Sequence, residues 1–167
     1  MSVLTMKNEF KDVANKGDGG FTLIELMIAV AIISITAGLA VPSYLQWNAR
    51  YQLRQAATQI TNQLTLARMT AMNRNRSVNV NLTKALGMVS VGATDVAGNQ
   101  VIPAQSLMGN VNDVTVGTIT FSSLGLRMSG TSGVNQQIQL TNSNGIVYSV
   151  RITPAGKANW CASSVCT

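Results

Sequence analysis

The chain has 167 residues, of which 46% are hydrophobic and 11% are charged, and its formal net charge is +6. This length leaves room for one membrane-spanning helix and one modest globular domain, so further domains are not expected. The chain contains no histidine, and beyond residue 41 its only acids are Asp95 and Asp113. We therefore expect no catalytic residue, no metal site and no cofactor.

The first segment, residues 1–20, precedes a long apolar run. Its lysines and acids balance, so its net side-chain charge is 3 − 3 = 0 (Lys7, Lys11 and Lys16 against Glu9, Asp12 and Asp18). Orientation in a membrane follows lysine and arginine rather than net charge, and three lysines before the run favour a cytoplasmic N-terminus. Residues 1–20 are predicted to be a cytoplasmic leader, and the chain after the run is predicted to be exported.

The apolar run, residues 21–41, is long enough to cross a membrane. As a helix its 21 residues would measure about 31 Å, close to the ~30 Å hydrocarbon core of a bilayer. The hydroxyls of Thr22, Ser34 and Thr36 can bond back to their own helix, whereas the Glu25 carboxylate is expected to have no such partner. Acids inside a span are usually functional; the alternative is that Glu25 reaches the headgroup layer.

The helix is predicted to continue beyond the run, over residues 42–75, as an amphipathic segment that ends near residue 73. Pro42 leaves the carbonyl of Gly38 without its helical partner, so a kink is expected at these two residues. Beyond it, small and apolar residues recur at helical spacing (Leu53, Ala56, Ala57, Ile60, Leu64, Ala67 and Ala71). This stripe predicts one buried face.

From residue 76 to residue 167 the pattern changes to short alternating stretches separated by turn residues. The predicted strands are residues 77–82, 87–91, 114–121, 125–128, 137–140, 147–152 and 158–161. An antiparallel sheet or small β-sandwich packed on the helix stripe would bury the stripe and the apolar face of the strands, so the predicted fold is α+β. Cys161 and Cys166, the only cysteines, are interpreted as a disulfide that fixes the C-terminal residues and stabilises by about 2 kcal/mol.

Residues 19–26, Gly-Gly-Phe-Thr-Leu-Ile-Glu-Leu, and the apolar helix after them resemble the type III signal of type IV pilins and type II secretion pseudopilins. The resemblance implies cleavage between Gly20 and Phe21 by a prepilin peptidase, followed by N-methylation of Phe21, so that the apolar run stays in the mature protein. It also implies that Glu25 pairs with the new amine of a neighbouring subunit. The implied partners are other pilin subunits, the peptidase/N-methyltransferase and an inner-membrane assembly platform.

The later part of the chain resembles the family of minor pseudopilin H and minor pilins T and U. Residues 64–72, 119–125 and 152–157 carry the resemblance, in this order along the chain. DNA-binding members of that family carry a C-terminal Gly-Arg-x-Arg. Here Gly156-Lys157-Ala158-Asn159 keeps one cation and loses the other, which weakens a DNA assignment.

The expected function is structural: a minor pilin or pseudopilin, anchored once in the inner membrane with its C-terminal domain in the periplasm, that joins a filament or its tip complex. The signal and helix serve both type IV pili and type II secretion, so both systems stay open. One alternative is a DNA-binding minor pilin, in which Arg74, Arg76, Arg151 and Lys157 gather into a phosphate-binding patch. The other, a membrane-anchored periplasmic enzyme or ligand-binding domain, is disfavoured by the missing histidine.

Overall fold

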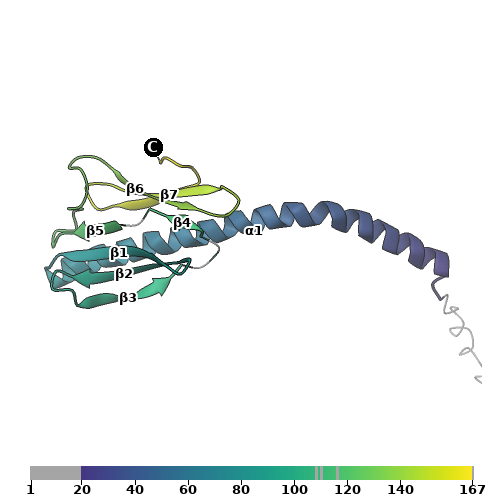
Figure 1. Ribbon diagram of the computed structural model, residues 1–167, viewed down its shortest axis with the longest axis horizontal. Coiled ribbons are helices and arrows are strands. Elements are labelled where there is room, and N and C mark those ends of the chain that lie inside the picture. The colour runs from purple at the N-terminus through teal and green to yellow at the C-terminus, as the bar shows by residue number, and fades with distance from the viewer. Residues whose placement is uncertain (1–19, 108, 110, 116, 167) are drawn as a thin grey trace, which may run out of the picture. The chain divides into compact units, whose positions relative to one another are not determined.

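The computed structural model describes residues 20–107, 109, 111–115 and 117–166, with the backbone alone for residues 40 and 41. One long helix, α1 (Leu23–Arg74), precedes eight strands among the described residues (Figure 1). The predicted leader lies outside the described residues except for Gly20. The chain divides into two compact units, Met1–Pro42 and Ser43–Thr167, and each is described by itself below.

Helix α1 confirms the predicted helix to within two residues at either end, and it contains Pro42. The predicted apolar stripe is buried, since all seven of its side chains are at most 1% exposed (Leu53, Ala56, Ala57, Ile60, Leu64, Ala67 and Ala71). Four of these seven residues are alanines, and such short side chains let strands approach the helix closely. The kink at Gly38 and Pro42 stays a prediction.

The strands form two antiparallel four-stranded sheets. The first sheet has the order β3-β2-β1-β5, and its strands are β1 (Val78–Ala85), β2 (Met88–Asp95), β3 (Gln100–Ser106) and β5 (Gly117–Phe121). The second has the order β4-β6-β7-β8, with β4 (Asp113–Val114), β6 (Gln136–Thr141), β7 (Val147–Ile152) and β8 (Ala158–Cys161). The predicted α+β fold is confirmed.

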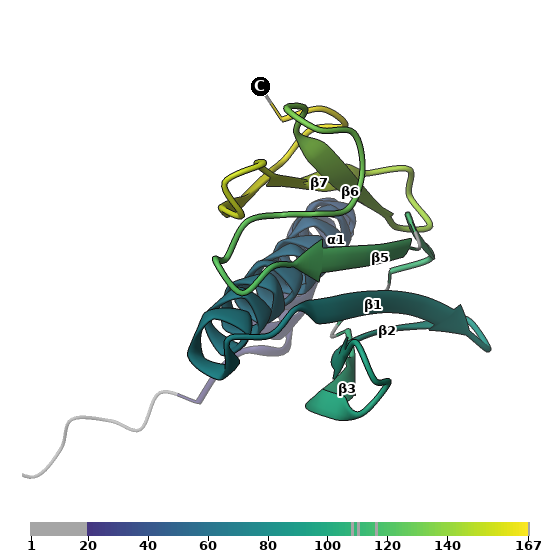
Figure 2. The same cartoon turned by 90° about the vertical axis from the view of Figure 1, so that its left-hand side faces the viewer.

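Both sheets turn an apolar face to the second part of α1. Along β1 the side chains of Val78, Val80 and Leu82 are buried while those between them are partly exposed, the alternation of a strand with one covered face. Ile138 and Leu140 of β6 do the same in the second sheet. Viewed along the helix, the sheets follow one another around one side of it (Figure 2), so one continuous core serves the whole unit.

Two strand predictions were wrong, and one strand was not predicted. Residues 114–121 do not form one strand: β4 pairs with β6 and β5 pairs with β1, because the chain passes from one sheet to the other between them. Residues 125–128 form a turn and one isolated bridge, since Ser122 N–H donates to the Leu126 carbonyl at 2.8 Å and reverses the chain. Strand β3 was missed. It contains Pro103, which an edge strand tolerates because one side of its ladder makes no bonds.

Candidate functional site

The first turn of α1 is closed by reciprocal bonds between Thr22 and Glu25. The Thr22 backbone N–H donates to Glu25 Oε2 at 2.9 Å, and the Glu25 N–H donates to Thr22 Oγ1 at 3.3 Å. This arrangement is a capping box. The expectation that Glu25 lacks a partner in its own helix is therefore wrong. The signal was present in the sequence, because Thr-x-x-Glu in front of an apolar run is the pattern of such a box.

The helix after this turn exposes its apolar side chains. Phe21, just before the helix, is 89% exposed, and the large apolar residues of the helix up to residue 39 are all more than half exposed. The hydroxyls of Ser34 and Thr36 donate to carbonyls four residues earlier, at 2.7 and 2.9 Å, as expected. Among the described residues no single helix is long and apolar enough to cross a membrane. Leu23–Leu39 and Pro42–Arg74, treated as two segments on either side of a short break, reach the required length and hydropathy only as a pair.

The three segments that carry the resemblance of the second unit meet at one point. Arg68 Nε donates to the Gly125 carbonyl at 2.9 Å. Gly125 and Gly156 both have a positive φ, of 74° and 76°, and a Cβ on Gly156 would lie 2.1 Å from the Gly125 carbonyl oxygen. Only glycine permits this approach of two turns. Residues 64–72, 119–125 and 152–157 therefore define a packing point of the fold.

The predicted disulfide between Cys161 and Cys166 is confirmed, and the loop that it closes covers the outer face of the second sheet. Ser149 of β7 is fully buried, and its hydroxyl donates to the Ser163 carbonyl at 2.7 Å. Gln139 Nε2 donates to the Ser164 carbonyl at 2.8 Å. The bridge therefore holds the end of the chain against polar side chains of β6 and β7.

The four cations of the predicted phosphate-binding patch do not share one surface hollow. Arg74 and Arg76 line a hollow of about 280 Å³ together with Asp95. Arg151 lines another, of about 240 Å³, beside the disulfide loop. Lys157 is exposed in the turn between β7 and β8, where its N–H donates to Thr153 Oγ1 at 3.1 Å. The structure thus brings Arg74 and Arg76 together, and the patch as a whole stays a prediction.

Arg127 is a buried cation that was not among the predicted site residues. It is 8% exposed, and its guanidinium donates to Gln136 Oε1 at 3.3 Å, to the Thr131 carbonyl at 3.2 Å and to the Val134 carbonyl. These bonds hold the loop before β6. No signal in the sequence marks this arginine, because two of its acceptors are backbone carbonyls, which every residue carries.

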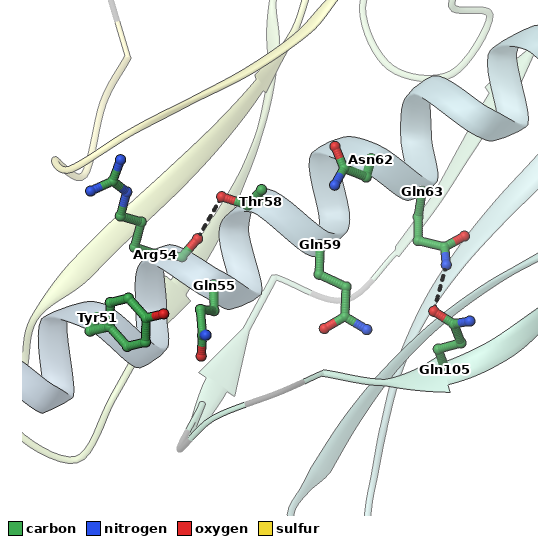
Figure 3. Close-up of a pocket in the computed structure, with 8 residues that line it drawn as sticks. All are labelled: Tyr51, Arg54, Gln55, Thr58, Gln59, Asn62, Gln63 and Gln105. Carbon is green, nitrogen blue, oxygen red and sulfur yellow. Dashed lines mark hydrogen bonds between the residues drawn. The ribbon is translucent and has the colours of Figure 1, made fainter.

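A groove of about 480 Å³, lined mainly by residues with polar side chains, runs along the exposed side of α1 and reaches strand β3. Figure 3 shows amide and hydroxyl side chains along it, with Gln63 Nε2 donating to Gln105 Oε1 at 2.8 Å and Thr58 Oγ1 to the Arg54 carbonyl. Its lining, as far as the structure describes it, holds one cation, Arg54, and no acid. The groove therefore offers hydrogen-bonding groups without an acid–base pair.

The two acids of the second unit serve local structure. Asp95 accepts hydrogen bonds from the side chain and backbone of Asn99 and from Ala97 N–H, and these donors hold its pKa below the usual value. Lys84 Nζ lies 3.1 Å from Asp113 Oδ1 and holds the pKa of that carboxyl below its usual value as well. Within the described residues no group of three His, Cys, Asp or Glu side chains could hold a metal ion.

These features define a class of protein. A long helix that exposes its apolar side chains in the first part and fills the core of a small β-rich unit with the second part is the architecture of a type IV pilin-like subunit. Residues 15–41 match the family model of the prokaryotic N-terminal methylation motif, and residues 56–156 match that of the type II transport protein GspH. The chain belongs to this GspH family of minor pilins and pseudopilins, whose members are structural subunits.

Individual relatives agree with this assignment. A fimbrial protein of Pseudomonas aeruginosa is 30% identical over 142 residues, which cover 83% of this chain and 88% of the relative. A fimbrial protein of Neisseria meningitidis is 34% identical over 100 residues, covering 56% and 58%. The crystal structure of the type IV minor pilin FimU of Pseudomonas aeruginosa superposes with a TM-score of 0.52 at 17% identity, over 72% of this chain and 99% of that one. This last likeness concerns the fold.

Proposed function

We propose that this chain is a minor subunit of a type IV pilus or of a type II secretion pseudopilus, anchored once in the inner membrane with its second unit in the periplasm. A prepilin peptidase cuts between Gly20 and Phe21 and methylates the new amine, and an inner-membrane assembly platform moves the subunit into the filament or its tip complex. The observation that carries the proposal is the exposed apolar helix that starts at the methylation motif. Such a surface must be covered by lipid or by other subunits.

Processing is tested on the protein purified from membranes. N-terminal sequencing and intact mass should give a chain that begins at methylated Phe21. Gly20→Leu should block the cut and keep the leader attached. A mature chain that begins within or after the apolar run would contradict the proposal.

Assembly is tested at Glu25, which we propose to meet a neighbour's amine after cleavage. Because Glu25 also caps its own helix, its loss has two effects that must be separated. Thr22→Val removes the hydroxyl of the capping box and leaves the carboxylate, so it is the matched control. We expect Glu25→Ala to allow insertion and processing while strongly lowering the amount of subunit in sheared filaments, and Thr22→Val to lower it little.

Equal losses in the two variants would show that Glu25 acts through the cap alone.

A companion experiment distinguishes a type IV pilus from type II secretion. Deletion of the gene should remove surface pili in the first case and a secreted substrate in the second. The DNA-binding alternative retains one supporting observation, the shared hollow of Arg74 and Arg76, and its test is given in the Discussion.

A further inference from the structure

The side chain of Arg151 lies partly buried on the outer face of the second sheet. Arg151 stands on β7 opposite Asn159 of β8 and Gln137 of β6. Its Nε is buried and has no hydrogen-bond partner among the described residues. An arginine in such a place normally has its donors satisfied, because a buried unpaired donor is destabilising.

Neighbouring polar groups and the other partly buried arginines do have partners. Ser149 and Gln139 bond to carbonyls of the disulfide loop on the same face. Arg68 Nε donates to a carbonyl at 2.9 Å, and Arg127, although its own Nε is also unpaired, makes three bonds through its other nitrogens. The fold thus provides oxygen partners nearby and none for Arg151.

The space beside this guanidinium suits an acidic side chain. The hollow measures about 240 Å³ and is lined by Arg151, Asn159, Trp160 and residues of the disulfide loop. At ~30 Å³ per water it has room for roughly eight water molecules. A guanidinium offers parallel N–H donors that match a carboxylate in two bonds. Among the described residues Arg151 is the only charged one in the lining, whereas a nucleic-acid backbone needs a row of cations.

Neither acidic side chain of the second unit is free to fill this place. Of its two acids, Asp113 is paired with Lys84 and Asp95 is bonded within its own turn. Nine cations stand against these two acids after the span, so the excess is 9 − 2 = +7 (Arg50, Arg54, Arg68, Arg74, Arg76, Lys84, Arg127, Arg151 and Lys157). An acidic side chain for Arg151 therefore has to come from another, more acidic molecule.

We propose that the hollow beside Arg151 is a docking site for an Asp or Glu side chain of a different, acidic filament subunit. This inference rests on the proposed function. It gives the disulfide loop a role in binding as well, because Cys161, Ser163, Val165 and Cys166 line the hollow. It also explains why a half-buried arginine is kept unpaired in the isolated chain.

The site is tested on the full chain in detergent micelles, by following the Arg Nε–H signals in NMR spectra. Titration with sodium acetate, against sodium chloride at equal ionic strength, should shift the Arg151 signal along a saturating curve. Arg151→Gln should abolish that signal, and Cys161→Ser with Cys166→Ser should abolish its saturation. A shift identical in chloride, or no shift at all, would overturn the proposal. A saturating shift with inorganic phosphate at tenfold lower concentration would overturn it in favour of a phosphate ligand.

Two further readouts separate a docking role from a structural one. Arg151→Gln should leave the melting temperature of the isolated chain unchanged or higher, and a clear decrease would show that Arg151 stabilises the fold. In cells, Arg151→Gln should reduce the amount of this subunit in sheared filaments at least fivefold. Lys84→Gln, which removes the same charge from an exposed pair on the other sheet, should not. Wild-type chain missing from filaments would refute the proposed function, whereas wild type and Arg151→Gln present in equal amounts would refute the inference alone.

Discussion

Gly156→Ala tests the packing point where two turns and the helix meet. A Cβ at Gly156 would lie 2.1 Å from the Gly125 carbonyl oxygen and 3.0 Å from Arg68 Nε. That oxygen belongs to the backbone and accepts the Arg68 hydrogen bond, so it cannot move aside without breaking the bond. The substitution must therefore separate the turn of residues 153–156 from the turn of residues 122–126.

The expected loss of stability has two parts. A non-glycine residue in the left-handed region costs about 1–2 kcal/mol, and the φ of Gly156 is 76°. Overpacking in a tight site adds about 1–3 kcal/mol, so the sum is about 2–5 kcal/mol. For a unit of this size, 1 kcal/mol corresponds to about 4 °C in melting temperature. Gly156→Ala should therefore lower the melting temperature by roughly 14 °C.

Gly145→Ala is the matched control. Gly145 has a φ of 72°, close to that of Gly156, but nothing lies within 4 Å of the position its Cβ would take. Only the conformational part remains, and the melting temperature should fall by roughly 6 °C. Thermal unfolding followed by circular dichroism measures both. If the two variants lose the same amount, the close approach contributes nothing and the argument from contact is refuted.

Four further outcomes are expected. Cys161→Ser should lower stability by about 2 kcal/mol in urea unfolding while the fold survives, and two free thiols in the unreduced wild type would contradict the bridge. Arg127→Met should cost about 3 kcal/mol, because carbonyls of the loop lose charged donors; a loss below 1 kcal/mol would contradict this role. The lowered pKa of Asp95 adds stability above its unfolded pKa that is lost as the pH falls through the folded value, so Asp95→Asn should flatten the decrease in melting temperature below about pH 4. If the chain binds DNA, gel shifts should weaken with salt by about −0.9 in log–log slope per phosphate, and Arg74→Gln with Lys157→Gln should flatten that slope; no retardation at high micromolar protein would exclude the activity.

Local patterns predicted the helix and the last strands because the responsible interactions are close in sequence. The stripe from Leu53 to Ala71 follows the helical repeat, and its burial was confirmed. Strands β7 and β8 have the predicted bounds, since alternating stretches flank a turn with proline and glycine. The capping box at Thr22 is equally local, and it was missed only because Glu25 had been considered by itself.

Long-range contacts decided what the sequence could not predict. Arg127 is buried where its backbone N–H donates to the Pro154 carbonyl at 3.0 Å, a contact between residues far apart in the sequence. Ser149 lies on the face of β7 that a single-layer sheet would expose, and it is buried because the chain returns over it as the disulfide loop. The burial of Arg151 Nε without an acceptor among the described residues likewise depends on the position of the disulfide loop beside it.

The passage of the chain from β4 to β5 affects how the second unit opens. Strand β4 closes one edge of the second sheet and β5 one edge of the first, and Thr115, between them, still exchanges a hydrogen bond with Gln139. Separation of β4 from the second sheet therefore strains the pairing of β5 in the first sheet, and the reverse also holds. Amide hydrogens of β1 and β6, although in different sheets, should exchange with solvent through the same opening event and with the same free energy of opening, as expected for one cooperative folding unit.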